Sequence, residues 1–179
     1  MWSNATTTTS GTGGTTAAGT GGSSGTGGTS GSKFLSTAYA MQPLTANGSM
    51  SLDIPYGNSA NGTNVQQTNG IYESSKFNLT ALSNGNYKIT MKAAPNKCLD
   101  NPIGSVNGSH PQIWDCNGNT NQQWQLNLDS TTGAYFIKSA SSGGCIDQPG
   151  GSLTGGLFMQ MYTCTATNKN QKFLLKSAP

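Results

Sequence analysis

The chain has 179 residues and a formal net charge of +3 at pH 7, which comes from nine lysines, no arginine and six acidic residues. Nucleic-acid binding depends on arginine and on a concentrated basic face, so this composition argues against a nucleic-acid partner. No apolar run approaches the length of about 20 residues that a membrane-spanning helix needs, so we expect no insertion into a membrane.

Residues 1–32 consist almost entirely of threonine, glycine, serine and alanine, and none of them is charged. Such a segment cannot bury enough apolar surface to offset the entropy of ordering it, which predicts a flexible linker or tail. An alternative is that its Thr/Gly runs add as a strand to a neighbouring molecule, so that residues 1–32 mediate self-association. No apolar stretch typical of a signal peptide follows Met1, so we expect no signal peptide in this chain.

From Lys33 onward, short alternating or apolar runs are separated by Asn, Gly, Ser and Pro, and no helical period is visible. Residues 87–91, 112–114, 135–137 and 159–162 are predicted to form strands, with turns between them. Many short strands with close turns indicate an all-β barrel or sandwich in residues 33–179.

One unit recurs three times in this part of the chain. An aspartate follows an aliphatic residue at Asp53, Asp100 and Asp147, and both intervals are 47 residues. A mid-repeat glutamine and a closing aromatic residue recur at nearly the same spacing, as Gln66, Gln112 and Gln160 and as Phe77, Trp124 and Phe173. Repeats of this length bury a shared core, so we predict a threefold barrel with repeats at approximately 35–82, 83–130 and 131–179.

The four cysteines form two pairs, each within one repeat: Cys98 with Cys116, and Cys145 with Cys164. Four cysteines allow three connectivities, but only pairing within repeats respects the internal symmetry. Each disulfide would stabilise the fold by about 3 kcal/mol, and disulfides indicate an oxidising compartment. The alternative is a zinc site or free thiols, but the chain has no CxxC motif and one histidine, so we predict no metal site.

Three motifs recur through these repeats: C-[LI]-D, then Q-x-[WY]-x-C, then N-Q-x-[WF], with the full pattern in the middle repeat. In these motifs the chain resembles the ricin B-type β-trefoil family of lectins and carbohydrate-binding modules, over roughly residues 35–179. The resemblance implies three four-stranded repeats around a pseudo-threefold axis, with one shallow sugar site in each repeat.

In the middle repeat, the resemblance implies that Asp100 accepts hydrogen bonds from sugar hydroxyls and that Trp114 stacks on the sugar. Gln112, Asn121 and Gln122 would complete this site. The chemistry is sound by itself, because a pyranose has a face of C–H groups that packs on an aromatic ring, and its adjacent hydroxyls suit a carboxylate.

The other two repeats offer less complete versions of this set. The third repeat has the same roles filled by Asp147, Gln160, Tyr162, Asn170 and Gln171. The first repeat keeps Asp53 and Gln66, but Thr68 stands in the place of the aromatic platform. We therefore expect its site to be degenerate, unless Tyr56 or Tyr72 supplies an aromatic ring from another direction.

Other prominent residues have structural explanations. The closing aromatics Phe77, Trp124 and Phe173 are predicted to form the core, and His110 is expected to face solvent in a loop. Glycosidases need two carboxylates roughly 5–10 Å apart, whereas a threefold axis would place the repeat aspartates on different outer faces. We therefore predict a chain that is not an enzyme and needs no cofactor.

Tails like residues 1–32 commonly join an accessory module to a catalytic domain in secreted bacterial enzymes. Together with the resemblance, this tail predicts a secreted, non-catalytic module that targets an attached polysaccharide-degrading domain to a galactose-, xylan- or glucan-type glycan. The main alternative is a structural or adhesive extracellular subunit that uses the trefoil as a scaffold and residues 1–32 for assembly. A freestanding lectin would differ from the module only in what is attached to it.

Overall fold

A computed structural model of the chain describes residue 34 and residues 37–102 and 106–179; the predictions made for residues 1–32 lie outside these ranges. The described residues form thirteen strands and six three-residue 3-10 helices. The strands are β1 (Ala38–Pro43), β2 (Met50–Asp53), β3 (Thr63–Asn64), β4 (Gln66–Asn69), β5 (Phe77–Ala81), β6 (Tyr87–Met91), β7 (Lys97–Asp100), β8 (Gln112–Asp115), β9 (Gln123–Asp129), β10 (Ala134–Ser139), β11 (Cys145–Asp147), β12 (Gln160–Tyr162) and β13 (Lys172–Ser177). The 3-10 helices are η1 (Leu44–Ala46), η2 (Pro55–Gly57), η3 (Glu73–Ser75), η4 (Thr120–Gln122), η5 (Pro149–Gly151) and η6 (Lys169–Gln171). Within this part of the chain, no helix is long and apolar enough to cross a membrane.

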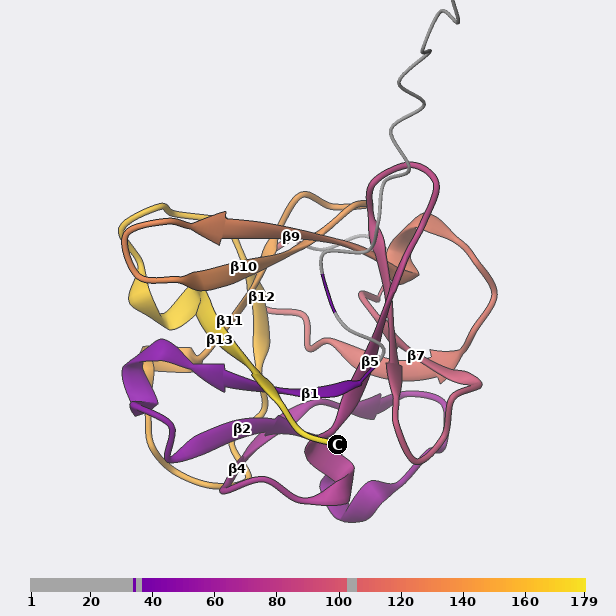
Figure 1. Ribbon diagram of the computed structural model, residues 1–179, viewed down its shortest axis with the longest axis horizontal. Helices are drawn as coiled ribbons and strands as arrows, with labels where there is room; N and C mark the ends of the chain where they lie inside the picture. Colours follow the sequence, from indigo (N-terminus) through magenta and orange to yellow (C-terminus); the bar gives the residue numbers. More distant parts are fainter. Residues whose placement is uncertain (1–33, 35–36, 103–105) are drawn as a thin grey trace, which may run out of the picture. The chain divides into compact units, whose positions relative to one another are not determined.

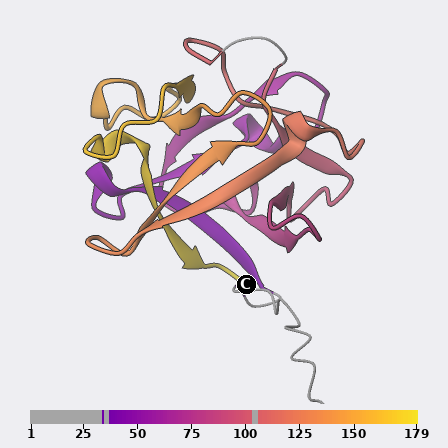
Figure 2. The same cartoon turned by 90° about the horizontal axis from the view of Figure 1, so that it is seen from above.

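Six strands pair antiparallel in a closed ring, in the order β1, β5, β6, β9, β10, β13 and back to β1. Three further hairpins, β2 with β4, β7 with β8, and β11 with β12, complete the repeats. Each repeat thus supplies two barrel strands and one hairpin. Figures 1 and 2 show the strands from two directions. This arrangement is a β-trefoil, and the predicted fold is confirmed.

The closing aromatic residues of the three repeats meet inside the barrel. Phe77, Trp124 and Phe173 have no exposed surface, which confirms that they belong to the core. The indole Nε1–H of Trp124 donates to the carbonyl oxygen of Leu99 at 2.9 Å, so the one polar atom of this buried ring is satisfied. The aliphatic residue that precedes each repeat aspartate is equally buried, as are its hairpin partners: Leu52, Leu99, Ile146, Ile113 and Met161.

Both predicted disulfides are present. Cys98 is bonded to Cys116, and Cys145 to Cys164, at sequence separations of 18 and 19 residues. Each disulfide begins in the first strand of a hairpin. Its second cysteine lies just after the second strand, one residue beyond β8 for Cys116 and two residues beyond β12 for Cys164. The first repeat has Ser51 in place of the first cysteine, and its hairpin is held by backbone pairing of β2 with β4.

His110 lies in a loop, as predicted, but it faces solvent only in part. It is half-buried, its Nδ1 lies 2.7 Å from the carbonyl oxygen of Met159, and its ring packs against Phe158. A carbonyl oxygen only accepts hydrogen bonds, so Nδ1 carries the proton. The flanking Ser and Pro indicated a loop, but the contact with a distant segment of the chain determines where the ring lies.

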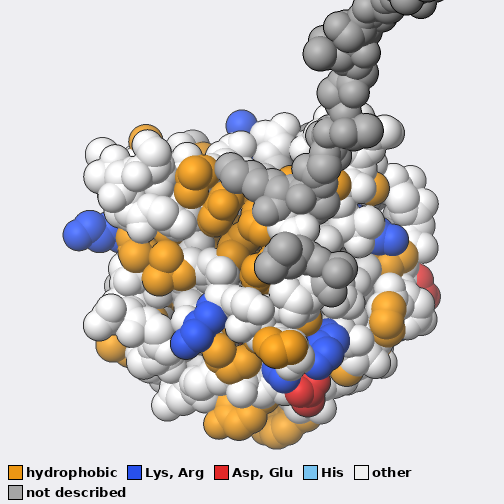
Figure 3. All heavy atoms as spheres, in the orientation of Figure 1, with side chains coloured by type: hydrophobic (Ala, Val, Ile, Leu, Met, Phe, Trp, Pro, Cys, Tyr) orange, Lys and Arg blue, Asp and Glu red, His pale blue; other side chains and the backbone are white. Residues whose placement is uncertain are grey.

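Charged side chains are few on the face that Figure 3 shows, and they stand singly or in small groups among polar atoms. The ion pairs of the described residues all join a lysine to an acidic residue, and they link Lys76 and Lys92 to Glu73, Lys97 to Asp115, and Lys172 to Asp129. The surface seen there has no broad basic area of the kind that contacts phosphate backbones.

Candidate functional site

In the middle repeat, three short segments place the predicted site residues side by side. Asp100 ends β7, Gln112 and Trp114 alternate along β8, and Asn121 lies in η4. Asp100 pairs directly with Gln112 across the hairpin, so their side chains share one face. Trp114, two residues along β8, stands on that same face because side chains alternate along a strand.

The carboxylate of Asp100 is held by three side-chain amides. Its Oδ1 accepts a hydrogen bond from Gln112 Nε2 at 3.0 Å, and its Oδ2 accepts from Asn121 Nδ2 at 2.6 Å and from Gln122 Nε2 at 3.0 Å. Gln122 is almost completely buried and also donates to the carbonyl oxygen of Asp115 at 2.9 Å. Gln122 therefore holds Asp100 from the buried side, while Gln112 and Asn121 line the pocket that is open to solvent.

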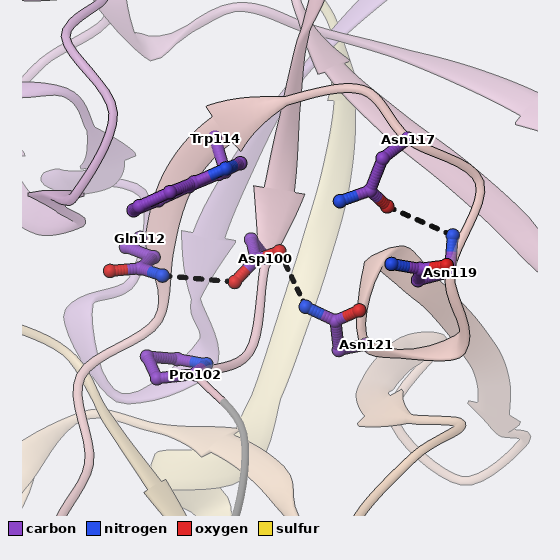
Figure 4. Close-up of a pocket in the computed structure, with 7 residues that line it drawn as sticks. All are labelled: Asp100, Pro102, Gln112, Trp114, Asn117, Asn119 and Asn121. Carbon is purple, nitrogen blue, oxygen red and sulfur yellow. Dashed lines mark hydrogen bonds between the residues drawn. The ribbon is translucent and has the colours of Figure 1, made fainter.

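An open pocket of about 320 Å³ lies over this carboxylate. Trp114 is 40% exposed, and Figure 4 shows its indole on one side of the Asp100–Gln112 pair and Pro102 on the other. The pocket is lined by Asp100, Pro102, Gln112, Trp114, Asn117, Asn119 and Asn121. An exposed aromatic face beside a fixed carboxylate and several amides matches the chemistry of a sugar ring, which has both a C–H face and hydroxyl groups.

A loop from the first repeat supports the outer end of β8. Asn61 Nδ2 donates to Asp115 Oδ2 at 2.8 Å, and Lys97 Nζ donates to Asp115 Oδ1 at 2.6 Å. The hydrogen bond from Lys97, and then the one from Asn61, hold the pKa of Asp115 below its usual value. Because both of its oxygens are engaged, Asp115 anchors the strand beside Trp114 and is a poor candidate for a second sugar-binding carboxylate.

The third repeat brings its aspartate, glutamine and tyrosine together in the same way, but it uses a different asparagine. Asp147 pairs with Gln160 and accepts a hydrogen bond from its Nε2 at 2.9 Å, and Tyr162 is 46% exposed. The other oxygen of Asp147 accepts from Asn168 Nδ2 at 3.1 Å, where the sequence pattern had suggested Asn170. The backbone carbonyl of Asn170 still accepts from Gln148 N–H at 3.0 Å.

Gln171 also differs from its counterpart Gln122. It is fully buried and donates to the carbonyl oxygen of Thr163 at 3.0 Å, while its Oε1 accepts from Thr165 N–H at 2.8 Å. These bonds fix the segment that follows Tyr162 and hold no part of Asp147. Gln171 therefore belongs to the support of the third-repeat site.

In the first repeat, Asp53 is buried, and it accepts hydrogen bonds from Gln66 Nε2 at 2.9 Å and from Ser75 Oγ at 3.0 Å. Ser75 thus replaces the amide donors of the other repeats with a hydroxyl. Thr68 is half-buried at the position of Trp114, so β4 itself offers no aromatic platform. The polar part of the site, Asp53 and its hydrogen-bond donors, is therefore present in the first repeat. β4 carries no aromatic residue for the apolar part.

Sequence reasoning missed four residues of these two sites: Pro102, Asn117, Asn119 and Asn168. Pro102 follows Asp100 by two residues, as Pro55 and Pro149 follow the other repeat aspartates, and this recurrence could have identified it. Asn168 lies 47 residues after Asn121, the same interval as that between the repeat aspartates, so the repeat period could have identified it. Asn117 and Asn119 lie in an Asn-rich turn, where nothing in the pattern distinguishes one amide from the next.

The acidic groups with shifted pKa values give no support for catalysis. Lys76 lowers the pKa of Glu73, Lys97 lowers that of Asp115, and Lys172 lowers that of Asp129 to about 2. A general acid at neutral pH needs a raised pKa instead. Among the described residues, no group of three or more His, Cys, Asp or Glu side chains could hold a metal ion.

Three solved structures resemble this fold over about four-fifths of the chain. The designed threefold symmetric protein ThreeFoil matches with a TM-score of 0.72 and 24% identity, over 79% of this chain and 99% of its own. An exo-β-1,3-galactanase from Clostridium thermocellum has a TM-score of 0.72 and 25% identity over 80% of this chain, which spans 31% of that enzyme. The Rhizoctonia solani agglutinin has a TM-score of 0.70 and 12% identity, over 81% of this chain and 97% of its own.

No curated protein matches the chain. The sequence model of the ricin-type β-trefoil lectin domain, however, matches residues 42–173, which include all three repeat aspartates and all three closing aromatics. Lectin domains bind carbohydrate, as the exposed indole beside the fixed carboxylate of Asp100 suggests independently. The chain therefore belongs to the ricin-type β-trefoil lectin domain family.

Proposed function

We propose that this lectin domain binds polysaccharide through the sites of the second and third repeats, and that it directs an attached polysaccharide-degrading domain to its substrate. One observation carries the proposal: Trp114 presents its ring to solvent directly beside a carboxylate that three amides hold in place. An exposed aromatic ring beside polar groups that are held in place is an arrangement suited to packing on a sugar ring.

The carboxylate is prepared for hydroxyl groups. An ionised aspartate offers about four acceptor positions, and three of those on Asp100 are filled by amides. Because these bonds fix its orientation before binding, little entropy is lost when a sugar hydroxyl donates to the remaining position. Asp147 has two such bonds, so the third-repeat site is less constrained.

The likeness to an exo-β-1,3-galactanase supports both parts of the proposal. This chain corresponds to about a third of that enzyme, which fits an accessory module beside a separate catalytic domain. We therefore place β-1,3-galactan first among the candidate glycans, ahead of xylan and glucan. The two disulfides fit an oxidising, extracellular setting, so we propose that the chain acts outside the cell.

Two sites on one chain can engage one polymer at the same time. A shallow site with a millimolar dissociation constant provides about 4 kcal/mol, and a second site on the same polymer increases the overall affinity through effective concentration. Weak individual sites are therefore compatible with firm attachment to insoluble polysaccharide.

The test is the binding of the full chain to β-1,3-galactan, xylan and β-glucan, beside the variants Trp114→Ala and Tyr162→Ala. Both rings are exposed, so their removal leaves the core intact. We expect each variant to weaken binding roughly tenfold, or about 1.4 kcal/mol, and the double variant to lose binding. Leu128→Ala is the matched control, because Leu128 is as exposed as Tyr162, at 46%, but lies on β9.

Wild-type chain that binds none of these glycans, or a double variant that binds as well as the control, would contradict the proposal. Targeting is tested separately by fusing the whole chain to a galactanase catalytic domain. The fusion should accelerate hydrolysis of insoluble galactan and leave hydrolysis of soluble oligosaccharides unchanged. Equal effects on both substrates would count against targeting.

A further inference from the structure

Each of the three sites has one wall that comes from another repeat. The backbone N–H groups of Gly62, Gly108 and Gly156 donate to carbonyl oxygens of Ile113, Met161 and Gln67, at 2.9, 3.0 and 2.8 Å. The three glycines share the left-handed conformation, with φ of 86°, 85° and 81°. The loop of one repeat therefore lies along the outer edge of the site of another, in a closed ring of three.

In the first repeat, this neighbouring loop brings an aromatic ring to the site. Phe158 forms an antiparallel bridge with Gln66, and directly opposed residues on antiparallel strands place their side chains on the same face. Gln66 is the residue that donates to Asp53. The ring of Phe158 is thus on the site face of the hairpin, and Figure 1 shows the segment that leads into β12 passing beside β4.

The middle repeat shows that this geometry is the regular one. There, Asn64 pairs with Gln112 in the same way that Phe158 pairs with Gln66. The two glutamines also point alike, because each Oε1 lies 4.0 Å from the position that a Cβ would take on the facing glycine, Gly62 or Gly156. The backbone around the site is therefore arranged in the same way in the first and second repeats. The two sites differ in their side chains.

Phe158 is a supported and exposed platform. It is 41% exposed, close to the 40% of Trp114. The ring of His110 packs on it, with centroids 5.6 Å apart, and His110 is itself fixed by its hydrogen bond to the carbonyl oxygen of Met159. The ring is therefore in contact with a fixed neighbouring ring and remains partly open to solvent, as a stacking platform must be.

We propose that the first repeat holds a third pyranose-binding site, in which Asp53 and Gln66 provide the polar contacts and Phe158 of the third repeat replaces the missing platform on β4. This inference rests on the proposed function, because it assumes that the same glycan chemistry is recognised. Asp53 is held by only two donors, so acceptor positions remain for sugar hydroxyls.

Strand geometry places the two halves of this site at a suitable separation. Neighbouring strands lie roughly 4.8 Å apart and same-face residues roughly 6.8 Å apart along a strand. Asp53 and Phe158 flank Gln66 on either side, which gives a Cα separation of roughly 10 Å. For Asp100 and Trp114, one strand and two residues apart, the same reasoning gives roughly 8 Å. A sugar in the first repeat would therefore lie across β4, whereas in the second repeat it lies along β8.

The experiment is an NMR titration of the full chain, observing the side-chain amides of Gln66, Gln112 and Gln160. These glutamines mark the three sites separately, because each donates to its own repeat aspartate. The probes are methyl β-galactoside, methyl β-xyloside and methyl β-glucoside. We expect at least one probe to shift the Gln66 amide signals in a saturable way. In Phe158→Ala, the dissociation constant reported by Gln66 should rise roughly tenfold, while that reported by Gln112 stays unchanged.

Phe158→Trp should keep the Gln66 response, and Leu153→Ala is the matched control, because Leu153 is an exposed apolar residue of the same segment. If Gln112 and Gln160 respond while Gln66 is silent, or if Gln66 responds equally in Phe158→Ala, the third site is refuted and the proposed function stands. If none of the three glutamines responds to any probe, the proposed function and the third site both fail.

Discussion

Replacing Asp100 with alanine should destabilise the fold as well as abolish sugar binding, because this side chain organises three neighbours. It accepts hydrogen bonds from Gln112, Asn121 and Gln122, and a hydrogen bond to a charged group contributes about 1.5–3 kcal/mol. Water can reach two of these amides through the open pocket, and Gln122 keeps its bond to a backbone carbonyl. The net loss should therefore be about 2–4 kcal/mol, below the sum of the three bonds.

Urea unfolding under non-reducing conditions, followed by circular dichroism, measures this loss. Asp53→Ala removes an acceptor with only two donors, one of them a hydroxyl, so it should cost about 1–2 kcal/mol. Asp115→Ala is the control, because its carboxylate is exposed and ion pairs of exposed carboxylates contribute little to stability. If Asp100→Ala costs no more than Asp115→Ala, the hydrogen-bonded carboxylate does not organise the hairpin as described.

Three further predictions concern stability. The double variant Cys98→Ser, Cys116→Ser should lose about 3 kcal/mol in the free energy of unfolding, as expected for a loop of 18 residues; a loss below 1 kcal/mol in urea unfolding would show that the bridge constrains little. Hydrogen bonds from Lys172, from the Thr132 hydroxyl and from the Thr131 N–H lower the pKa of Asp129 to about 2. These bonds therefore stabilise the fold above the ordinary aspartate pKa near 4, and their contribution disappears as the pH falls from about 4 to about 2. Asp129→Asn should flatten thermal stability in that window, and an unchanged profile would contradict the assignment. Tyr56 is fully exposed with φ of 53°, a strained conformation for a residue with a side chain, so Tyr56→Gly should raise stability by up to about 1 kcal/mol; a lower melting temperature would show that the ring makes a stabilising contact.

The register of the three repeats could be predicted from the sequence because the recurring residues occupy fixed positions along the strands. Asp53, Asp100 and Asp147 each end the first strand of a hairpin, and the cysteines flank the same hairpins in two repeats. Residues that close a core or a disulfide must return at nearly constant spacing, so simple subtraction along the chain located them. The barrel, the hairpins and both disulfides were therefore predictable.

The asparagine of the third repeat was predicted at the wrong residue. Aligning N-Q-x-[WF] on its closing aromatic residue selects Asn170, but the asparagine that donates to the aspartate lies 21 residues after it in both repeats, as Asn121 and Asn168. The interval from this asparagine to the closing aromatic is three residues in the second repeat and five in the third. Asn170 instead places its Oδ1 only 2.9 Å from where a Cβ would stand on Gly151, so the missing side chain of that glycine leaves the space that Asn170 uses.

The platform of the first repeat was missed for a related reason. The residue on β4 that matches Trp114 is Thr68, and the other aromatic candidates, Tyr56 and Tyr72, belong to the same repeat. Phe158 reaches the same site from a segment 92 residues further along the chain than Gln66, through one bridge. A contact of this kind arises from how the repeats close around their axis, and no pattern within a single repeat contains it.

The central claim is that a glycan packs on the exposed ring of Trp114. Acrylamide quenching of tryptophan fluorescence tests it in a Trp2→Phe variant of the full chain, where Trp114 is 40% exposed and Trp124 is completely buried. Titration with β-1,3-galactan oligosaccharides or soluble xylan should reduce quenching in a saturable way, with the midpoint at the dissociation constant found by direct binding. Binding that leaves the quenching of Trp114 unchanged would contradict the account, because the sugar would then lie elsewhere on the molecule.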